Sequence, residues 1–215
     1  MKLLERVLEL FYPTKCAFCH KLTGGDNVCK SCAEKLPLTP AGGQAQKFPF
    51  ISQCVSPLYY EGDVRESLHR YKFGGLSHYC TVYAPFMAKC IDENQISCDI
   101  ITWVPLSRKR LRQRGYDQAR LLAAELSKKA GIECCRLLKK TRNNPAQSGT
   151  GGAEKRRANV SGVYTALSPE KIAGKSILIV DDIVTTGATL SECGRMLLSA
   201  GAKEVKAVTV ARKRN

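Results

Sequence analysis

Two adjacent carboxylates, Asp181 and Asp182, directly follow a run of four branched apolar residues at positions 177–180. Such a run is typical of a parallel strand that is buried on both faces of a sheet. The residues after the acids are small or carry hydroxyl groups, and they lead into an apolar-periodic helix. A tight turn at a helix N-terminus presents unpaired backbone N–H groups, and the helix dipole favours an anion there. The residues that would form this turn are Thr185, Thr186, Gly187, Ala188 and Thr189.

This pattern predicts a phosphate in the turn, with the two carboxylates on sugar hydroxyls or on a metal ion. Gly187 would let the backbone approach the phosphate closely, and the threonine hydroxyls would add donors. The segment lacks Gly-x4-Gly-Lys-Ser/Thr, so it is not a Walker A motif, and it is not a dinucleotide fingerprint either. The alternative is a hydroxyl-rich turn without a ligand. Two carboxylates that close a buried strand argue against that alternative, because unpaired buried charges are costly.

Four cysteines near the N-terminus form two Cys-x2-Cys pairs, Cys16 with Cys19 and Cys29 with Cys32, around a glycine-containing turn. Four sulfur ligands favour a tetrahedral Zn²⁺ ion in a closed structural site. His20 could replace one sulfur, and two unrelated redox or buried pairs are the alternative. The other seven of the eleven cysteines have no such spacing, and we expect them to be small buried apolar residues. They are Cys54, Cys80, Cys90, Cys98, Cys134, Cys135 and Cys193.

The chain is strongly basic, with 34 Lys and Arg against 19 Asp and Glu and a formal net charge of +15. This charge predicts attraction to nucleic acid, phosphorylated ligands or an anionic membrane surface, although a merely solvated basic surface has the same composition. Arg108 and Lys109 begin the densest basic run, 107–118, after a second buried strand at 99–105. At the carboxyl edge of a sheet the run could hold a diphosphate, since Arg makes two-point contacts. A solvated helix start is the alternative.

The elements that would position these groups follow the order of an α/β domain with a parallel sheet. We expect strands over 54–60, 99–105, 132–138, 160–164, 177–180 and 205–210. We expect helices through Val64–Tyr71 and over 79–93, 119–129 and 190–199. Between them, the polar segment 139–159 combines glycines with a basic end, which predicts a mobile flap that closes over phosphates.

The same pattern divides the chain into three parts. Residues 1–38 would hold a short amphipathic helix and the cysteine ribbon, 39–50 a linker, and 51–215 the α/β domain. Glu5, Arg6 and Glu9 interrupt the apolar core that a signal peptide needs, and no segment is long and apolar enough to span a bilayer. Cysteines without an export signal favour reduced thiols and metal binding. We therefore expect a cytoplasmic protein that is not an integral membrane protein.

Over essentially its full length, the chain resembles the ComF family (competence protein F), a group of phosphoribosyltransferase-like proteins. Segment 177–190 resembles the phosphoribosyl-diphosphate (PRPP) fingerprint of type I phosphoribosyltransferases. Combined with the four cysteines, an Arg-rich run ending in Arg-Gly-Tyr-Asp-Gln and a basic loop ending in Arg-Ala-Asn-Val, it is similar to ComF specifically. The resemblance implies a type I phosphoribosyltransferase fold, a parallel sheet flanked by helices, with a small N-terminal four-cysteine zinc ribbon.

The resemblance also implies PRPP, or a related phosphosugar, with Mg²⁺ at the edge of the sheet. Asp181 and Asp182 would bind the ribose hydroxyls directly or through metal, and residues 185–189 would wrap the 5′-phosphate. Arg108 and its neighbour Lys109 match the region that faces the diphosphate, and Arg156 and Asn159 match the Arg-x-x-Asn element after the mobile loop. Thr185 stands where purine phosphoribosyltransferases often carry an acid, so the general base is unknown. Orotate phosphoribosyltransferases also have Thr there, so catalysis remains open.

Three functions are compatible with these features. The ComF resemblance implies a role in natural competence and DNA uptake, with PRPP as ligand and contact to single-stranded DNA. The alternative is an active phosphoribosyltransferase, which transfers the phosphoribosyl group from PRPP to a nucleobase or another acceptor. A third option is that the ribbon docks on proteins of the DNA-uptake machinery, at the inner face of the membrane.

Overall fold

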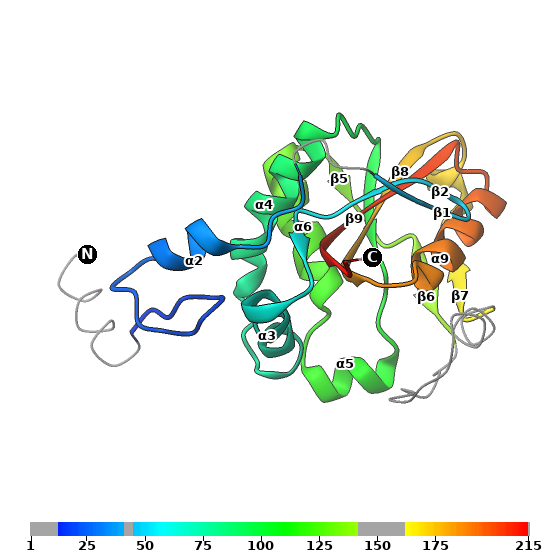
Figure 1. The fold of residues 1–215 in the computed structure, drawn as a ribbon. Helices are drawn as coiled ribbons and strands as arrows, with labels where there is room; N and C mark the ends of the chain where they lie inside the picture. Colours follow the sequence, from blue (N-terminus) through cyan, green and yellow to red (C-terminus); the bar gives the residue numbers. More distant parts are fainter. Residues whose placement is uncertain (1–12, 41–44, 142–161, 215) are drawn as a thin grey trace.

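The computed structural model of this 215-residue chain describes residues 13–40, 45–141 and 162–214 (Figure 1). The expected N-terminal helix lies outside the described residues, as do the flap residues Arg156 and Asn159. The described part contains a seven-stranded sheet with the order β1-β2-β9-β8-β4-β5, and β3 also pairs with β9. Neighbouring strands of this sheet run parallel, except that β1 is antiparallel to β2.

The bounds of these strands place the longest two at the centre. They are β1 (Gln46–Phe48), β2 (Ile51–Val55), β3 (Leu58–Tyr59), β4 (Ile100–Trp103), β5 (Glu133–Cys134), β8 (Ser176–Val184) and β9 (Glu204–Arg212). The helices are α2 (Lys30–Lys35), α3 (Gly62–Phe73), α4 (Tyr79–Glu93), α5 (Arg108–Arg114), α6 (Gln118–Ala130), α8 (Pro169–Ile172) and α9 (Ala188–Ser199). A separate antiparallel pair joins β6 (Leu138–Lys140) to β7 (Tyr164–Ala166).

Alternate residues of β8 pack into two different cores, because side chains of a strand point to opposite faces. Leu178 and Val180 belong to the core that contains the buried side chains of α3, α4 and α6. Ile177 and Ile179 belong to the core that contains those of α9, β6 and β7. Figure 1 shows α3, α4 and α6 on one side of the sheet and α9 on the other. The described part of the chain therefore has the three-layer α/β architecture that the sequence predicts.

Three strand predictions need correction. The two acids do not end their strand, since β8 continues to Val184 and pairs there with Arg212 of β9. On its other side β8 loses its partner earlier, because β4 ends opposite Val180. The strand expected over 132–138 is two elements, β5 in the main sheet and β6 in the small sheet. The strand expected over 54–60 is interrupted at Pro57, which has no N–H for the ladder.

Other segments also differ from the expectation. The expected linker 39–50 contains β1 and a turn, so part of it belongs to the sheet. The basic run after β4 forms the short helix α5, which Ser107 caps by accepting the Arg110 N–H. Among the described helices, none has both the length and the apolar character needed to cross a membrane.

Candidate functional site

The two carboxylates of β8 point to opposite faces of the sheet. Asp182 is 8% exposed and lies on the α3 side, where its Oδ1 is 2.9 Å from Nζ of Lys72. Asp181 follows the alternation to the α9 side, and its charge influences the pKa values of Lys140 and Cys193 there. The Asp182 N–H donates to Oδ1 of Asp181 at 2.8 Å. A ligand at this edge of the sheet would therefore meet carboxylate oxygens on both sides of one strand.

The electrostatics of the pair favour a cationic ligand. Burial raises the pKa of Asp181, and the adjacent Asp182 carboxylate raises it further, while Lys72 opposes the shift. Lys72 is the only cation that forms an ion pair with either acid among the residues that the structure describes. The raised pKa keeps Asp181 protonated near neutral pH in the free protein, and a divalent ion would favour its ionised form by displacing that proton.

The hydroxyl-rich turn between β8 and α9 has the geometry expected of an anion site. Gly187 caps α9 with a left-handed φ of 70°, which only glycine adopts at low cost. The Ala188 N–H donates to Oγ1 of Thr186 at 3.5 Å, and the first N–H groups of α9 have no carbonyl partner within the helix. Thr185 is exposed, while Thr186, Ala188 and Thr189 are half-buried. The five residues thus form one partly open turn directly after the acid pair.

An aromatic ring from the sheet edge fixes this turn. A Cβ on Gly187 would overlap the ring of Phe48 on β1, and a Cβ on Gly194 would lie 2.5 Å from the carbonyl oxygen of Phe50. The two glycines are seven residues apart, so they share one face of α9. The β1–β2 turn therefore lies directly on α9, and the absence of side chains at Gly187 and Gly194 permits this approach.

Besides Lys72, other cations of the described chain lie near the acid pair or its neighbours. Arg108 and Lys109 are exposed on the first turn of α5 and form no ion pair within the described part of the chain. Burial lowers the pKa of Arg114 at the end of α5, and the charge of Asp182 opposes this shift. Lys140 lies near Arg110 and Asp181, and burial lowers its pKa. Arg114 and Lys140 are therefore within electrostatic range of the acids, and Arg110 lies near Lys140.

Sequence reasoning missed Lys72, which it did not single out as a site residue. Lys72 follows the buried Leu68 by four residues, and i,i+4 neighbours share a face of a helix. Lys72 lies in the last turn of α3, so the same helix face extends past the core to the edge of the sheet. The periodicity of α3 was therefore a signal that could have found it.

The four cysteine thiols lie together, with their Sγ atoms all within 4.8 Å of one another. The Sγ atoms of Cys19 and Cys29 are 3.7 Å apart. A tetrahedral ion with metal–sulfur bonds of about 2.3 Å would separate its ligands by roughly 3.8 Å, so the cluster could hold a metal ion. Burial opposes ionisation of Cys16, but backbone hydrogen bonds from Cys29, Cys19 and Phe18 lower its pKa to about 6. The set is complete without His20, whose Nδ1 lies 3.4 Å from the Tyr79 hydroxyl.

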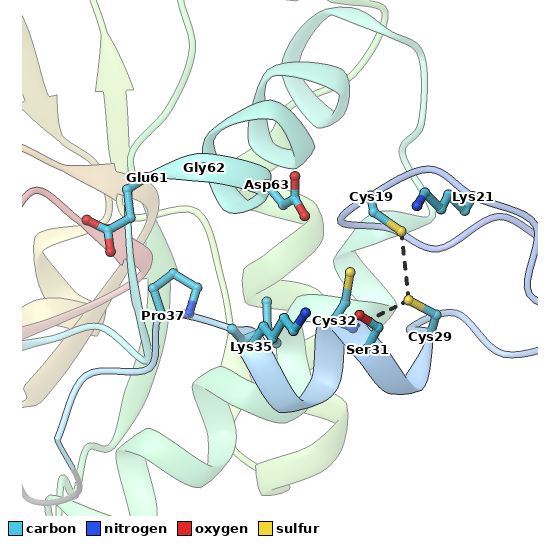
Figure 2. Close-up of a pocket in the computed structure, with 11 residues that line it drawn as sticks. Cys19, Lys21, Cys29, Ser31, Cys32, Lys35, Pro37, Glu61, Gly62 and Asp63 are labelled. Carbon is cyan, nitrogen blue, oxygen red and sulfur yellow. Dashed lines mark hydrogen bonds between the residues drawn. The ribbon is translucent and has the colours of Figure 1, made fainter.

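The ribbon is packed against the α/β domain through its first cysteine loop. Ala17 and Phe18 are fully buried, and the Phe18 ring meets Tyr83 and Phe86 edge-on at 6.2 Å. Ser67 and Arg70 of α3 donate to the carbonyl oxygen of Ala17. Figure 2 shows Cys19, Cys29 and Cys32 on one side of a cavity of about 430 Å³, with Glu61, Gly62 and Asp63 at the start of α3 on the other. The cysteine cluster therefore has a defined place beside α3.

The remaining cysteines agree in part with the expectation. Cys54, Cys80, Cys90 and Cys193 are buried, while Cys98, Cys134 and Cys135 are half-buried. Burial raises the pKa of the Cys54 thiol to about 12 and that of Cys90 to about 11. These thiols are therefore protonated packing groups at neutral pH.

Comparison with known proteins identifies a domain that contains the acid pair and the Gly187 turn. Residues 116–215 match the phosphoribosyl transferase domain family. The chain is 29% identical over 205 residues to the DNA utilization protein YhgH of Escherichia coli, covering 89% of this chain and 87% of that protein. It is 29% identical over 214 residues to the competence protein ComFC of Bacillus subtilis, covering 87% of this chain and 85% of that protein. Glutamine PRPP amidotransferase from B. subtilis superposes with a TM-score of 0.43 at 22% identity, over 61% of this chain and 26% of that one.

Proposed function

We propose that the chain is a member of the ComF family that binds PRPP and handles single-stranded DNA during natural competence. Its relatives of similar length are named for competence and for DNA utilization. The observation that carries the PRPP part is the adjacency of the acid pair and the Gly187 turn at the carboxyl end of β8. Ligands of parallel α/β sheets bind at that edge.

Each group of the site would take one part of PRPP. The turn at Thr185–Thr189 would hold the 5′-phosphate with its N–H groups and hydroxyls. Asp181 and Asp182 would bind the ribose hydroxyls, directly or through Mg²⁺, and Mg²⁺ would supply charge neutralisation for the diphosphate. Arg110, Arg114 and Lys140 would supply positive charge to the diphosphate. Arg108, Lys109, Arg156 and Asn159 remain predicted diphosphate and flap residues.

Lys72 has a specific part in this arrangement. Its Nζ compensates the charge of Asp182 in the free protein at 2.9 Å. Ribose hydroxyls or a divalent ion would take over part of that contact on binding. The lysine then becomes available to the ligand's negative charge, which keeps the site near neutrality in both states.

The cysteine ribbon would hold a structural Zn²⁺ ion. Its donor set is four thiols with no open position, which suits zinc without catalysis. With the ribbon packed on α3 and α4, the metal would stabilise the domain. Docking on a partner of the DNA-uptake machinery would be a second use of the same ribbon, and we propose a cytoplasmic location.

Turnover of PRPP is the alternative function, and the cations beside the acids favour it. Positive groups fixed at the diphosphate would stabilise the charge that develops as it leaves. Thr185, however, is an exposed hydroxyl at the position of the acid in many purine enzymes. A phosphoribosyltransferase reaction would therefore need a base from the acceptor or from another segment.

Titration calorimetry with PRPP and Mg²⁺ tests the PRPP site. We expect saturable binding by the unmodified protein and at least a tenfold loss of affinity in the double variant Asp181→Asn, Asp182→Asn. The matched control is Asp92→Asn, an exposed acid at the end of α4. Equal PRPP affinity in the double variant and the control would contradict the assignment. The DNA part is tested separately by binding of a fluorescent oligothymidylate at low salt.

A further inference from the structure

A second concave surface lies beside the acid pair, on the outer side of α5. This α5–α6 groove encloses about 790 Å³ at the carboxyl end of β4. Its lining combines apolar, aromatic and basic side chains from β4, α5, α6 and the segment after β5. The lining residues are Trp103, Pro105, Leu106, Leu111, Gly115, Tyr116, Asp117, Arg120, Leu121, Ala124 and Arg136.

The floor and one wall of the groove are apolar. Trp103, which is 9% exposed, and the half-buried Tyr116 both contribute to the lining, and Leu121 continues the apolar surface along α6. Leu111 is 41% exposed on α5, although every neighbour from Arg108 to Arg114 other than Gln113 is cationic. Leu111 is one of the large exposed apolar residues of the described chain, and it lines the groove. It offers a planar apolar ligand a second wall opposite α6.

The rim of the groove is positively charged. Arg120 and Arg136 line it, and both are exposed. Neither arginine forms a salt bridge within the described ranges. Asp117 is the one acid among the lining residues, and its carboxylate accepts N–H groups of Leu106 and Arg120, each at 3.2 Å. The groove therefore presents net positive charge around an apolar floor.

Helix α5 separates this groove from the proposed PRPP site. Arg114 is half-buried, and the charge of Asp182 influences its pKa. Arg110 influences the pKa values of Lys140 and Tyr164 on the α9 side. Leu111 and Gly115, in contrast, line the groove. The same seven-residue helix thus directs some of its arginines toward the acids and other side chains toward the groove.

We propose that the α5–α6 groove binds single-stranded DNA, with bases on its apolar floor and phosphates on its arginine rim. This inference rests on the proposed DNA contact and gives it a location. Single strands combine planar apolar bases with a phosphate chain, and proteins bind them with aromatic platforms in basic grooves. The groove has both components, whereas an acidic peptide would use the rim and leave the floor without a ligand.

The position of Trp103 gives a direct assay, because it is the only tryptophan of the chain. We expect oligothymidylate to quench its fluorescence in a saturable manner. In the double variant Arg120→Ser, Arg136→Ser, the affinity should fall at least tenfold with PRPP affinity unchanged. Loss of two phosphate contacts should reduce the salt slope, log Kd against log salt, by about 1.4. The matched control removes two exposed cations elsewhere, Arg65→Ser with Lys175→Ser, and should change the affinity less than threefold.

A second variant tests the apolar floor and does not depend on the arginines. The unmodified protein should prefer oligothymidylate over an abasic phosphodiester of equal length, and Leu111→Ser should abolish this preference. Because Leu111 is partly exposed, its replacement should leave the fold intact. Equal affinity of the unmodified protein for both oligomers would overturn the proposal. Competition by poly-glutamate for oligothymidylate binding that is as strong as competition by unlabelled oligothymidylate would also overturn it.

The outcomes separate this inference from the function on which it rests. If the unmodified protein binds PRPP but no oligothymidylate at low salt, the proposed DNA contact itself is wrong. If it binds oligothymidylate, and the double arginine variant behaves as the control, only the groove assignment is wrong.

Discussion

The Nζ atom of Lys72 lies 2.9 Å from Oδ1 of Asp182, so the last turn of α3 is tied to the strand that carries both acids. The pair is largely buried, with side-chain exposures of 20% and 11%. Tyr116 and Gln118 fix the same helix end by donating to the carbonyl oxygens of Tyr71 and Lys72. The proposed PRPP site therefore depends on how α3 ends.

Replacing Lys72 with Met should destabilise the protein and weaken PRPP binding, because Asp182 would remain buried without its partner. We expect a loss of about 2–3 kcal/mol in the free energy of unfolding, measured by urea denaturation. The control Lys89→Met removes an exposed pair with Glu93 and should cost less than about 1 kcal/mol. An equal loss of unfolding free energy in both variants would show that the Lys72 contact stabilises the protein no more than an exposed ion pair does.

Replacing Gly187 with Ala should cost stability for two reasons, the positive φ and the overlap with Phe48. Gly174 has an almost identical φ of 71° with open space around it, so Gly174→Ala measures the backbone cost alone, about 1 kcal/mol. Thermal unfolding should show a larger loss for Gly187→Ala, and adding Phe48→Ala should recover part of the difference. If the two alanine variants lose the same stability, the ring does not constrain the turn.

Removing one ribbon cysteine should remove the metal. Mass spectrometry under native conditions should find one Zn²⁺ per chain, absent in Cys29→Ser and present in the control Cys98→Ser. Melting of the zinc-free protein should occur at lower temperature, because Phe18 packs between the ribbon and α4. Zinc that persists in Cys29→Ser would contradict the four-sulfur site.

Glu192 should make stability depend on pH in the acid range. Hydrogen bonds from Arg195, and less so from the Gly162 N–H, lower its pKa below 4.5 against the effect of burial. The unfolded chain then binds more protons than the folded one, so this stabilisation is present above pH 4.5 and is lost as the pH falls. Glu192→Gln should remove about 1 kcal/mol at pH 7 and flatten the decline. An unchanged pH profile, equal to that of the exposed-site variant Glu34→Gln, would refute this role.

Local patterns predicted the groups that are contiguous in sequence. The acid pair, the turn at Gly187 and the two cysteine pairs each occupy a short segment. Their chemistry could therefore be predicted from residue types and spacing alone. The helices containing Leu68 and Leu122 were also predictable, because their apolar periodicity is strong. In each case the residues that form the pattern lie close together in the sequence.

Groups that meet through tertiary packing were not predictable in the same way. The continuation of β8 past Asp181 depends on the length of its neighbour β9, which extends to Arg212. Lys72 reaches Asp182 across 110 residues of sequence, a distance that no local pattern spans. Arg214 likewise pairs with Glu61 at 2.7 Å and lies over the Tyr59 ring, contacts that no local pattern indicates.

Calorimetric titration of PRPP with Mg²⁺, in the absence and presence of saturating oligothymidylate, tests the central claim most directly. We expect one PRPP per chain in both cases. The two anions should weaken each other's binding by the same factor, several-fold at low salt, because like charges on the two sides of α5 repel each other. Absence of saturable PRPP binding with and without DNA would contradict the account.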